Sequence, residues 1–169
     1  PTLPVYTLTA AVEIELDIRK SRFIGIVMPV DNRDAAQRQL EQLRAQHRGA
    51  THVCWALMAG GQSGMSDDGE PSGTAGRPML EVLRHHELDG VLAAVVRYYG
   101  GIKLGAGGLV RAYTDAIATA LKQAQRIERI AYVEVEIAIA YADESQLRYW
   151  LQQKHYALLG SRHDTLARL

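Results

Sequence analysis

The chain has 169 residues, of which 47% are hydrophobic and 22% charged, and these proportions are typical of a globular protein rather than a disordered one. Its 19 basic and 19 acidic residues give a formal net charge of zero, so bulk charge cannot supply non-specific affinity for nucleic acid. Any binding to nucleic acid therefore needs a local basic patch.

Cysteine content and hydropathy exclude two further classes of protein. The single cysteine, Cys54, excludes an internal disulfide and a cysteine-rich zinc site. No stretch reaches the roughly 18 to 20 unbroken apolar residues of a membrane span. The first residues, PTLPVYTLTAAVEIEL, lack the basic and apolar regions of a secretory signal. We therefore expect a cytoplasmic protein with no membrane contact.

The first third of the chain predicts two strands, a helix and a third strand. In the segment VEIELDI apolar and charged side chains alternate, which is typical of a strand with one solvent-facing side. Asp31 is placed to cap the helix, whose apolar stripe consists of Ala36, Leu40 and Leu43. These elements are predicted at residues 12–18, 23–30, 32–47 and 52–59.

The middle of the chain predicts two further helices around a buried strand. The run VLAAVV is typical of a strand that is buried on both faces. The four-residue spacing of Leu109, Tyr113, Ile117 and Leu121 supports a long helix after it. In order, we predict a loop at 60–76, a helix at 78–86, a strand at 91–96, a glycine-rich loop at 100–108 and a helix to about residue 125.

The pattern changes near residues 126–131, and a strand, a helix and a strand are predicted after it. Asp143 is placed to cap the helix, with Gln146 in the capping-box position. The strands are predicted at 132–139 and 155–160. Because such a fragment is too small to bury a core of its own, we expect a second small domain whose C-terminal half is missing here.

The segment RYYGGIKLGAGGLVRAY, residues 97–113, places a glycine-rich turn between a buried strand and a helix. Backbone N–H groups can converge on an anion there, and Arg97, Lys103 and Arg111 add positive side chains. The phosphate-loop motif is absent, and the dinucleotide motif would need glycine where Val110 stands. Two interpretations stay open, namely an anion or nucleic-acid contact and a set of glycines that only permits tight packing.

The segment SDDGEPSGTAGRPML, residues 66–80, begins with three carboxylates in a loop. Asp67, Asp68 and Glu70 could bind a divalent cation or act as acid and base, but the EF-hand spacing is absent, and a solvated turn is the simpler interpretation. We predict neither a metal site nor a cofactor.

Hydroxyl, thiol and imidazole groups are available for catalysis, but no motif organises them. The sequence has no G-x-S-x-G elbow, and Cys54 lies within an apolar strand, where a buried thiol is the simpler interpretation. Tyr98 and Tyr99, beside Arg97, could stack nucleic-acid bases or could merely finish a strand. We predict no catalytic residue.

Taken together, three segments carry a resemblance to a known family. KSRFIG at 20–25, SDDGEPSGTAGRPML at 66–80 and VVRYYGGIKLGAGGLVRAY at 95–113 resemble the IMPACT family, most closely its bacterial YigZ-like branch. The resemblance spans residues 12 to about 125 and implies an α+β, two-domain protein. Residues 1–127 would resemble domain four of elongation factor G. Residues 128–169 would be part of a ferredoxin-like domain similar to the last domain of that factor.

The family resemblance also implies a function. The eukaryotic relatives regulate translation by binding an activator of an initiation-factor kinase. The resemblance therefore implies a non-enzymatic, translation-linked regulator that binds RNA or a ribosome-associated partner through its two glycine-rich loops. The alternatives are a metal-dependent hydrolase or phosphoryl-transfer enzyme that uses the acidic loop, and a protein-interaction module. The sequence does not indicate an oligomeric state.

The resemblance carries two sets of residues over to this chain. The nucleic-acid- or anion-binding positions are Arg77, Arg97, Tyr98, Gly100, Gly101, Lys103, Gly105, Gly107, Gly108 and Arg111. The motif-loop positions are Ser66, Asp67, Asp68, Gly69, Glu70, Gly73, Thr74, Gly76 and Pro78. We expect the two loops to lie side by side at one end of the N-terminal sheet. Arg77, Arg97 and Lys103 would form a basic floor there, with the three carboxylates at its rim.

Overall fold

The computed structural model describes residues 5–129 and 134–169 and has a mixed α/β fold with antiparallel sheets. Its contacts divide the chain into two compact units, residues 1–130 and residues 131–169, and each unit is described by itself.

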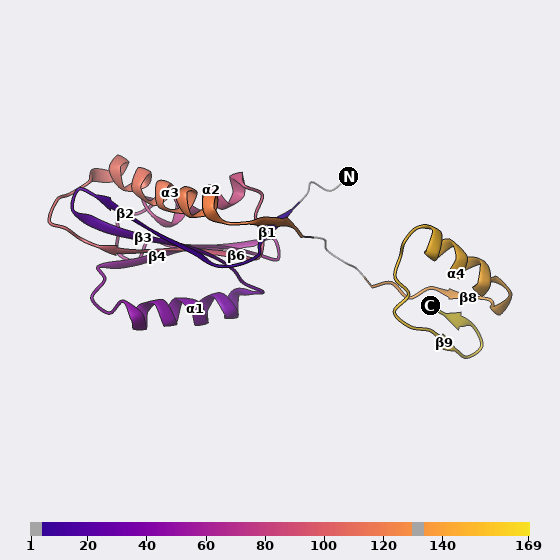
Figure 1. The fold of residues 1–169 in the computed structure, drawn as a ribbon. Coiled ribbons are helices and arrows are strands. Elements are labelled where there is room, and N and C mark those ends of the chain that lie inside the picture. The colour runs from indigo at the N-terminus through magenta and orange to yellow at the C-terminus, as the bar shows by residue number, and fades with distance from the viewer. Residues whose placement is uncertain (1–4, 130–133) are drawn as a thin grey trace. The chain divides into compact units, whose positions relative to one another are not determined.

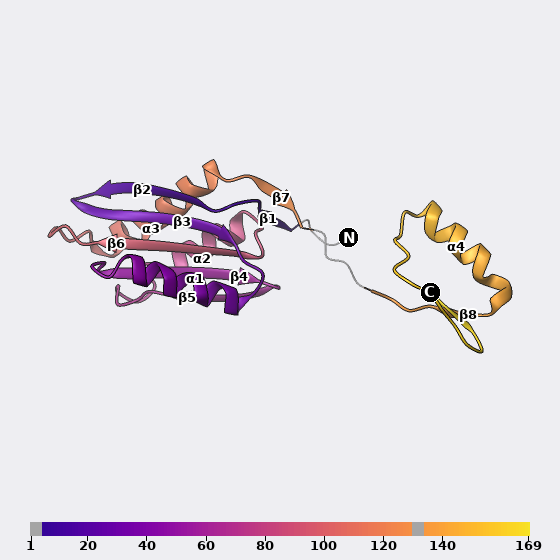
Figure 2. The same cartoon turned by 60° about the horizontal axis from the view of Figure 1, so that its bottom comes forward.

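The N-terminal unit is built on a five-stranded sheet in which every neighbouring pair is antiparallel (Figure 2). Its strands are β2 (Val12–Ile18), β3 (Ser21–Pro29), β4 (His52–Ala59), β5 (Gln62–Ser66) and β6 (Val91–Tyr98), in the order β2-β3-β6-β4-β5. A separate antiparallel pair joins β1 (Tyr6–Leu8) to β7 (Arg126–Glu128). The domain boundary expected between residues 127 and 128 therefore falls inside β7, a strand of the N-terminal unit.

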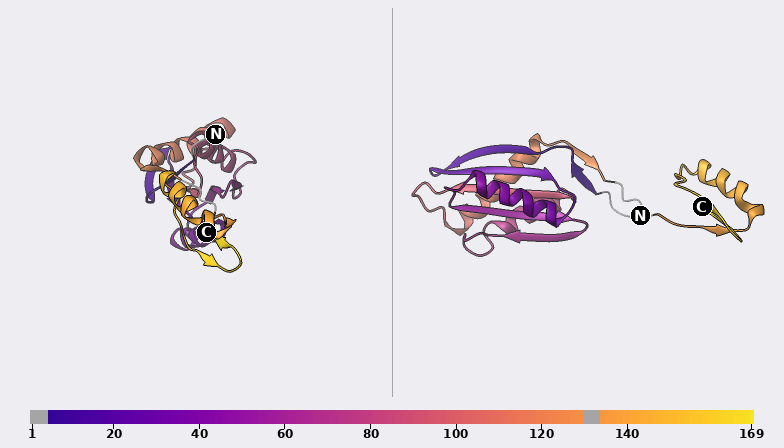
Figure 3. Two further views of the ribbon diagram at one scale, coloured as in Figure 1. Left: turned by 90° about the vertical axis from the view of Figure 1, so that its right-hand side faces the viewer. Right: turned by 90° about the horizontal axis from the view of Figure 1, so that it is seen from below.

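Helices cover both faces of the sheet. Helix α1 (Arg33–Gln46) packs on one face, and α2 (Gly76–His85) and α3 (Gly105–Gln123) pack on the other (Figures 1 and 3). On α1 the predicted stripe Ala36, Leu40 and Leu43 is buried, as are Leu109, Tyr113 and Ile117 on α3.

Strand β6 is central, and this position explains its composition. Val91, Ala93 and Val95 face the α2–α3 layer, while the alternate residues Leu92 and Ala94 face α1. The prediction of a strand buried on both faces is confirmed. Because both faces are covered by helices and both edges are paired, the strand has no position that favours a polar side chain until Arg97.

Two predictions about helix starts need correction. Asn32, not Asp31, caps α1, because its side-chain oxygen accepts a hydrogen bond from Ala35 N at 2.8 Å. Helix α2 begins at Gly76, two residues before the predicted start at Pro78.

The predicted loop at 60–76 is wrong in its first part, because Gln62–Ser66 forms the edge strand β5. Gly60 and Gly61 make the hairpin turn with φ values of 61° and 76°, which glycine adopts without strain. The carboxylate of Asp89 accepts hydrogen bonds from both of their N–H groups and so fixes the turn.

The C-terminal unit holds a small antiparallel sheet and one helix. The strands are β8 (Ala138–Ile139), β9 (Arg162–His163) and β10 (Ala167–Arg168), in the order β8-β10-β9, and a 3-10 turn (Tyr141–Asp143) leads into α4 (Glu144–Gln153). Ala167 and Leu169 are the buried hydrophobic residues among the described residues of this unit, and α4 has none.

Three sequence predictions for this unit differ from the structure. Residues 155–160 form no strand. Of the strand predicted at 132–139, Tyr132 and Val133 lie outside the described residues, and only Ala138 and Ile139 of the remainder pair in a sheet. Asp143 lies at the N-cap position before α4, but its side chain makes no capping hydrogen bond. Among the described helices, none is long and apolar enough to cross a bilayer.

Candidate functional site

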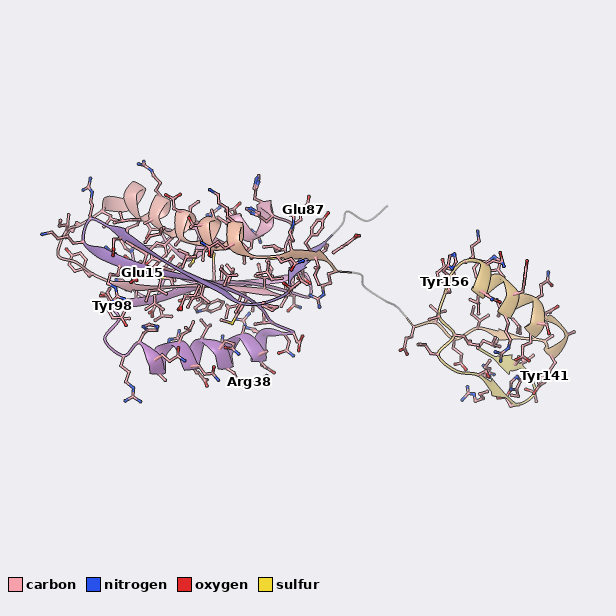
Figure 4. The ribbon with its side chains drawn as sticks, in the orientation of Figure 1. Glu15, Arg38, Glu87, Tyr98, Tyr141 and Tyr156 are labelled. Carbon is pink, nitrogen blue, oxygen red and sulfur yellow. The ribbon has the colours of Figure 1, made fainter. Side chains whose placement is uncertain are left out.

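Both motif segments meet at one end of the N-terminal sheet. The sheet register pairs His52 with Arg97 and Arg22 with Tyr98, so the start of β4, the end of β6 and the start of β3 coincide there. Figure 4 labels Tyr98 near this end and Glu87 near the opposite end. The 66–76 loop leaves β5 on the same side as the glycine-rich loop that follows β6.

Asp67 holds the start of α2. Its two carboxylate oxygens accept hydrogen bonds from the backbone N–H groups of Gly73, Ala75 and Gly76, at 2.9, 3.1 and 2.8 Å. Burial by itself would raise the pKa of Asp67, but these three hydrogen bonds bring it below the ordinary value. The carboxylate therefore acts as a remote cap for a helix whose first residue has no side-chain cap of its own.

Asp68 fixes the loop to the start of β4. Its Oδ2 accepts a hydrogen bond from Val53 N, and its carbonyl oxygen lies 2.7 Å from His52 Nδ1. Ser66 Oγ in turn accepts a hydrogen bond from Asp68 N. The residue has a φ of 41°, which a side chain other than glycine rarely adopts, and these contacts hold it there.

Glu70 forms a buried ion pair with Arg97. Arg97 Nη1 lies 2.6 Å from Glu70 Oε1, and only 5% and 3% of the two side chains are exposed. The Tyr113 hydroxyl donates to the same carboxylate oxygen at 2.8 Å, and Arg97 Nη2 donates to Ser21 Oγ at 3.3 Å. The guanidinium also lies against the rings of Phe23 and Tyr99. The pair thus joins the motif loop to β6, β3 and α3.

This pair corrects the expected arrangement of a basic floor with an acidic rim. Arg97 is buried and neutralised by Glu70, so neither residue presents an exposed charge. Asp67 and Asp68 are likewise bonded to backbone N–H groups, and so all three carboxylates of the segment serve its own fold. Within residues 5–129 and 134–169, no three metal-ligating side chains form a group that could hold an ion.

Cys54 and Tyr113 extend the buried network below the loop. The Cys54 thiol donates to the carbonyl oxygen of Asp67 at 3.0 Å and lies 3.4 Å from the Tyr113 hydroxyl. Burial raises the pKa of the thiol to about 12, although its hydrogen bond with Tyr113 acts in the opposite direction. Burial also raises the pKa of Tyr113. Both groups stay protonated at neutral pH, which suits packing rather than nucleophilic attack.

The two segments line one cleft of about 400 Å³. Glu70 and Pro71 of the first segment face Lys103 and the first residues of α3 across it. Its remaining lining comes from Thr51, His52, Arg97, Tyr99, Leu104, Gly105, Ala106 and Leu109. Helix α3 begins here without a side-chain cap, so the N–H groups of its first turn are available to a ligand. The expectation that the two loops lie side by side agrees with this geometry.

Arg77 and Arg111 lie away from that cleft. Arg77 is exposed and lines a groove of about 540 Å³ between α2 and α3, together with Pro78, Val82 and Val110. Arg111 is exposed on α3 and lines neither depression. The predicted cluster of Arg77, Arg97 and Lys103 is therefore divided into a groove residue, a buried residue and a cleft residue.

The remaining motif positions shape the backbone. A Cβ at Gly100 would lie 2.0 Å from the Lys20 carbonyl oxygen, so only glycine allows the glycine-rich loop to contact the β2–β3 turn. The buried Thr74 hydroxyl donates to the carbonyl oxygen of Pro71, and the buried Pro78 lies in the first turn of α2. The left-handed φ values belong to Gly69, Gly73, Gly101 and Gly105, whereas Gly107 and Gly108 lie within the first turn of α3.

Sequence reasoning missed several residues that build this end of the sheet. Ser21, which the sequence marks only as part of KSRFIG, accepts hydrogen bonds from both Arg97 and Gly100 N. The helical spacing of Tyr113 gives no sign of its hydrogen bond to Glu70, and no motif points to Thr51, whose hydroxyl accepts a hydrogen bond from Tyr99 N. Arg19 and Lys20, which form the turn between β2 and β3, have φ values of 46° and 66°. A two-residue gap between two strand patterns was the signal for that turn.

Comparison with known proteins gives consistent relatives. The Impact N-terminal domain matches residues 19–121. An IMPACT family member of Haemophilus influenzae is 44% identical, over 82% of this chain and 68% of the relative. YvyE of Bacillus subtilis is 40% identical, over 90% and 75%, and YigZ of Escherichia coli is 38% identical, over 95% and 81%.

Two solved structures are also similar. The crystal structure of a hypothetical protein has a TM-score of 0.77 and 36% identity, covering 100% of this chain and 84% of that chain. The two-domain translational regulator Yih1 has a TM-score of 0.39 and 22% identity, covering 73% of this chain and 49% of that chain, which is too distant a likeness to bear on function.

Proposed function

The chain belongs to the IMPACT family, and from this premise we propose that it is a non-enzymatic, translation-linked regulatory protein. It binds RNA or a ribosome-associated partner through the cleft between its two glycine-rich loops. Such a partner would place the protein in the cytoplasm.

The observation that carries the proposal is the shared cleft. Glu70 and Pro71 line it on one side, and Lys103 and the uncapped start of α3 line it on the other. A positive side chain beside free backbone N–H groups suits a phosphate or a carboxylate. The buried Glu70–Arg97 pair holds the two segments in place, so the cleft is formed before a ligand arrives.

The proposed architecture supports the same function. We propose that the N-terminal unit resembles domain four of elongation factor G and that the C-terminal unit is part of a ferredoxin-like domain. Two such domains in tandem would correspond to a portion of a translation factor, which suits a ribosomal partner. The enzyme alternative gains no support from the site, since Asp67, Asp68 and Glu70 are engaged by backbone N–H groups and by Arg97.

Co-sedimentation with ribosomes tests the proposal. The full chain and a Lys103→Glu variant are run on density gradients at low and moderate salt. Lys122→Glu is the matched control, because Lys122 is also an exposed lysine and lies in the last turn of α3. We expect the wild type and the control to travel with a ribosomal fraction and Lys103→Glu to remain at the top. If all three remain at the top while circular dichroism shows them folded, the proposal is wrong.

A protein-interaction module is the second candidate function, because the α2–α3 groove is mainly apolar and open to solvent. Val110, which lines it, is 38% exposed. In this case a partner would be recovered by pull-down after nuclease treatment. Val110→Asp would abolish the recovery, whereas Lys103→Glu would not.

A further inference from the structure

The turn between β2 and β3 presents two cations in an unusual backbone conformation. Arg19 and Lys20 both have positive φ, which two-residue hairpin turns require and for which asparagine and glycine are the usual residues. Both side chains are exposed. The turn is not isolated, since the Lys20 backbone packs so closely against Gly100 that no Cβ would fit there. The turn and the glycine-rich loop therefore form one continuous surface.

Aromatic and apolar side chains lie on the same surface. The Tyr99 side chain is 46% exposed, and Ile102 is 38% exposed. The buried guanidinium of Arg97 lies 5.4 Å from the centroid of the Tyr99 ring and supports the ring from below. Arg97 covers one face of the Tyr99 ring. The exposed part of the ring is open to a flat ligand.

Acidic side chains at this end of the sheet are largely engaged. Glu15 pairs with Arg22 at 2.6 Å, and Glu70 pairs with the buried Arg97. Asp68 accepts a hydrogen bond from Val53 N. The other carboxylates of β2, Glu13 and Asp17, are exposed as well, and Asp17 lies opposite Arg22 in the register. The charges of Arg19, Lys20 and Lys103 are thus not cancelled by ion pairs within the described residues, although the chain as a whole is neutral.

We propose that this surface, which we call the sheet-end platform and define as Arg19, Lys20, Tyr99, Ile102 and Lys103, binds a single-stranded polynucleotide. A base stacks on Tyr99, and Arg19, Lys20 and Lys103 contact phosphates. An exposed ring accepts an unstacked base, whereas the bases of a duplex are already stacked on one another. The inference rests on the proposed function and names the class of ligand for it.

The size of the electrostatic contribution follows from the number of cations. Three phosphate contacts to a single strand give a slope of about −2 for the logarithm of affinity against the logarithm of salt concentration. Removal of one contact should lower the steepness by about 0.7. Loss of one stacking ring should weaken binding by about 5- to 150-fold.

Fluorescence anisotropy with the full chain tests the platform. The probes are a labelled 12-nucleotide uridine RNA, a thymidine DNA of the same length and an RNA duplex of the same length. We expect both single strands to bind more tightly than the duplex. Tyr99→Ala should weaken binding by about 5- to 150-fold, the contribution of one stacking ring. Tyr99→Phe should retain the affinity, because phenylalanine keeps the ring. Lys20→Gln should reduce the salt slope, while the control Lys122→Gln should leave it unchanged.

The outcomes separate this inference from the proposed function. Equal or tighter binding of the duplex overturns the platform, and so does unchanged binding by a folded Tyr99→Ala variant. If the chain travels with ribosomes in a Lys103-dependent way but binds no single strand at low salt, the surface recognises protein and the inference fails while the proposed function stands. If single strands bind through Tyr99 but no ribosomal fraction is found, the inference stands, and the proposed function fails in its ribosomal partner and in its link to translation while its RNA partner is kept.

Discussion

Removal of the Glu70 carboxylate should strongly destabilise the N-terminal unit. In Glu70→Ala, Arg97 keeps its charge in a site where only 5% of its side chain is exposed, and it loses a partner at 2.6 Å. Its Nε already has no hydrogen-bond partner among the described residues. Without Glu70, Ser21 Oγ is the side-chain acceptor that remains for the guanidinium. Breaking a buried ion pair by removing one partner costs about 3 to 5 kcal/mol. Loss of the acceptor for the Tyr113 hydroxyl acts in the same direction.

Urea unfolding followed by tryptophan fluorescence measures this cost. Trp55 is buried in the N-terminal unit and Trp150 belongs to the C-terminal unit, so a Trp150→Phe background lets Trp55 report alone. With a urea slope of about 2 kcal/mol per M, the midpoint should fall by about 1.5 to 2.5 M. Glu81→Ala is the matched control, because its contact with Arg84 at 3.7 Å is exposed and should contribute less than about 1 kcal/mol.

A double variant distinguishes the buried charge from a packing effect. Glu70→Leu combined with Arg97→Met removes both charges and keeps apolar volume beside Phe23, so most of the lost stability should return. If Glu70→Ala unfolds within 1 kcal/mol of Glu81→Ala, Arg97 is solvated without its partner. The ion pair would then not hold the two segments together.

Three further predictions concern the surrounding network. Asp67→Ala should cost about 1 to 2 kcal/mol at pH 7. Because the pKa of Asp67 is lowered in the folded protein, this difference should shrink as the pH falls below about 4, and a difference between urea midpoints that stays constant from pH 7 to pH 3 would contradict it. Gly100→Ala should destabilise by about 1 to 3 kcal/mol through its clash with the Lys20 carbonyl, whereas Gly107→Ala, which meets open space in a helix, should stabilise by about 0.5 to 1 kcal/mol in thermal unfolding. The Cys54 thiol, with a pKa of about 12, should resist an aromatic disulfide reagent at pH 8 until urea unfolds the chain, and rapid labelling of the native protein would show that the thiol is accessible.

Elements with a strong local pattern could be predicted from the sequence, and those that depend on distant partners could not. The alternation in β2 and the four-residue spacing in α3 follow from which face is buried, so they are visible within one segment. Strand β5 has the sequence QSGMS and lies at the edge of the sheet, where nothing requires alternating apolar side chains. The apolar run at 155–160 suggested a strand, but no neighbouring strand pairs with it in the described part of the chain.

The same distinction applies to the site. The composition of both motif segments is unusual, and their residues carry the resemblance to the family. The pairing of Glu70 with Arg97 could not be foreseen, since the two residues are 27 positions apart and meet because β4 and β6 are neighbours. The separation of Arg77 from Lys103 also depends on how distant segments pack. The α2–α3 packing assigns the first to a groove and the second to the cleft.

The strand order of the sheet also determines when the N-terminal unit can form during synthesis. The β2–β3 and β4–β5 hairpins are complete by residue 66, yet they share no ladder, because β6 lies between β3 and β4. The sheet therefore cannot close until residue 98 has been made, 32 residues after residue 66, which takes roughly 2 to 6 s at the usual rates of synthesis. During that interval the inner edges of two hairpins stay open, and late, non-local closure of this kind is slow and prone to aggregation. Helix α3 must follow before Phe23 and Val27 are covered, so the nascent chain rather than the finished protein is the state most in need of protection.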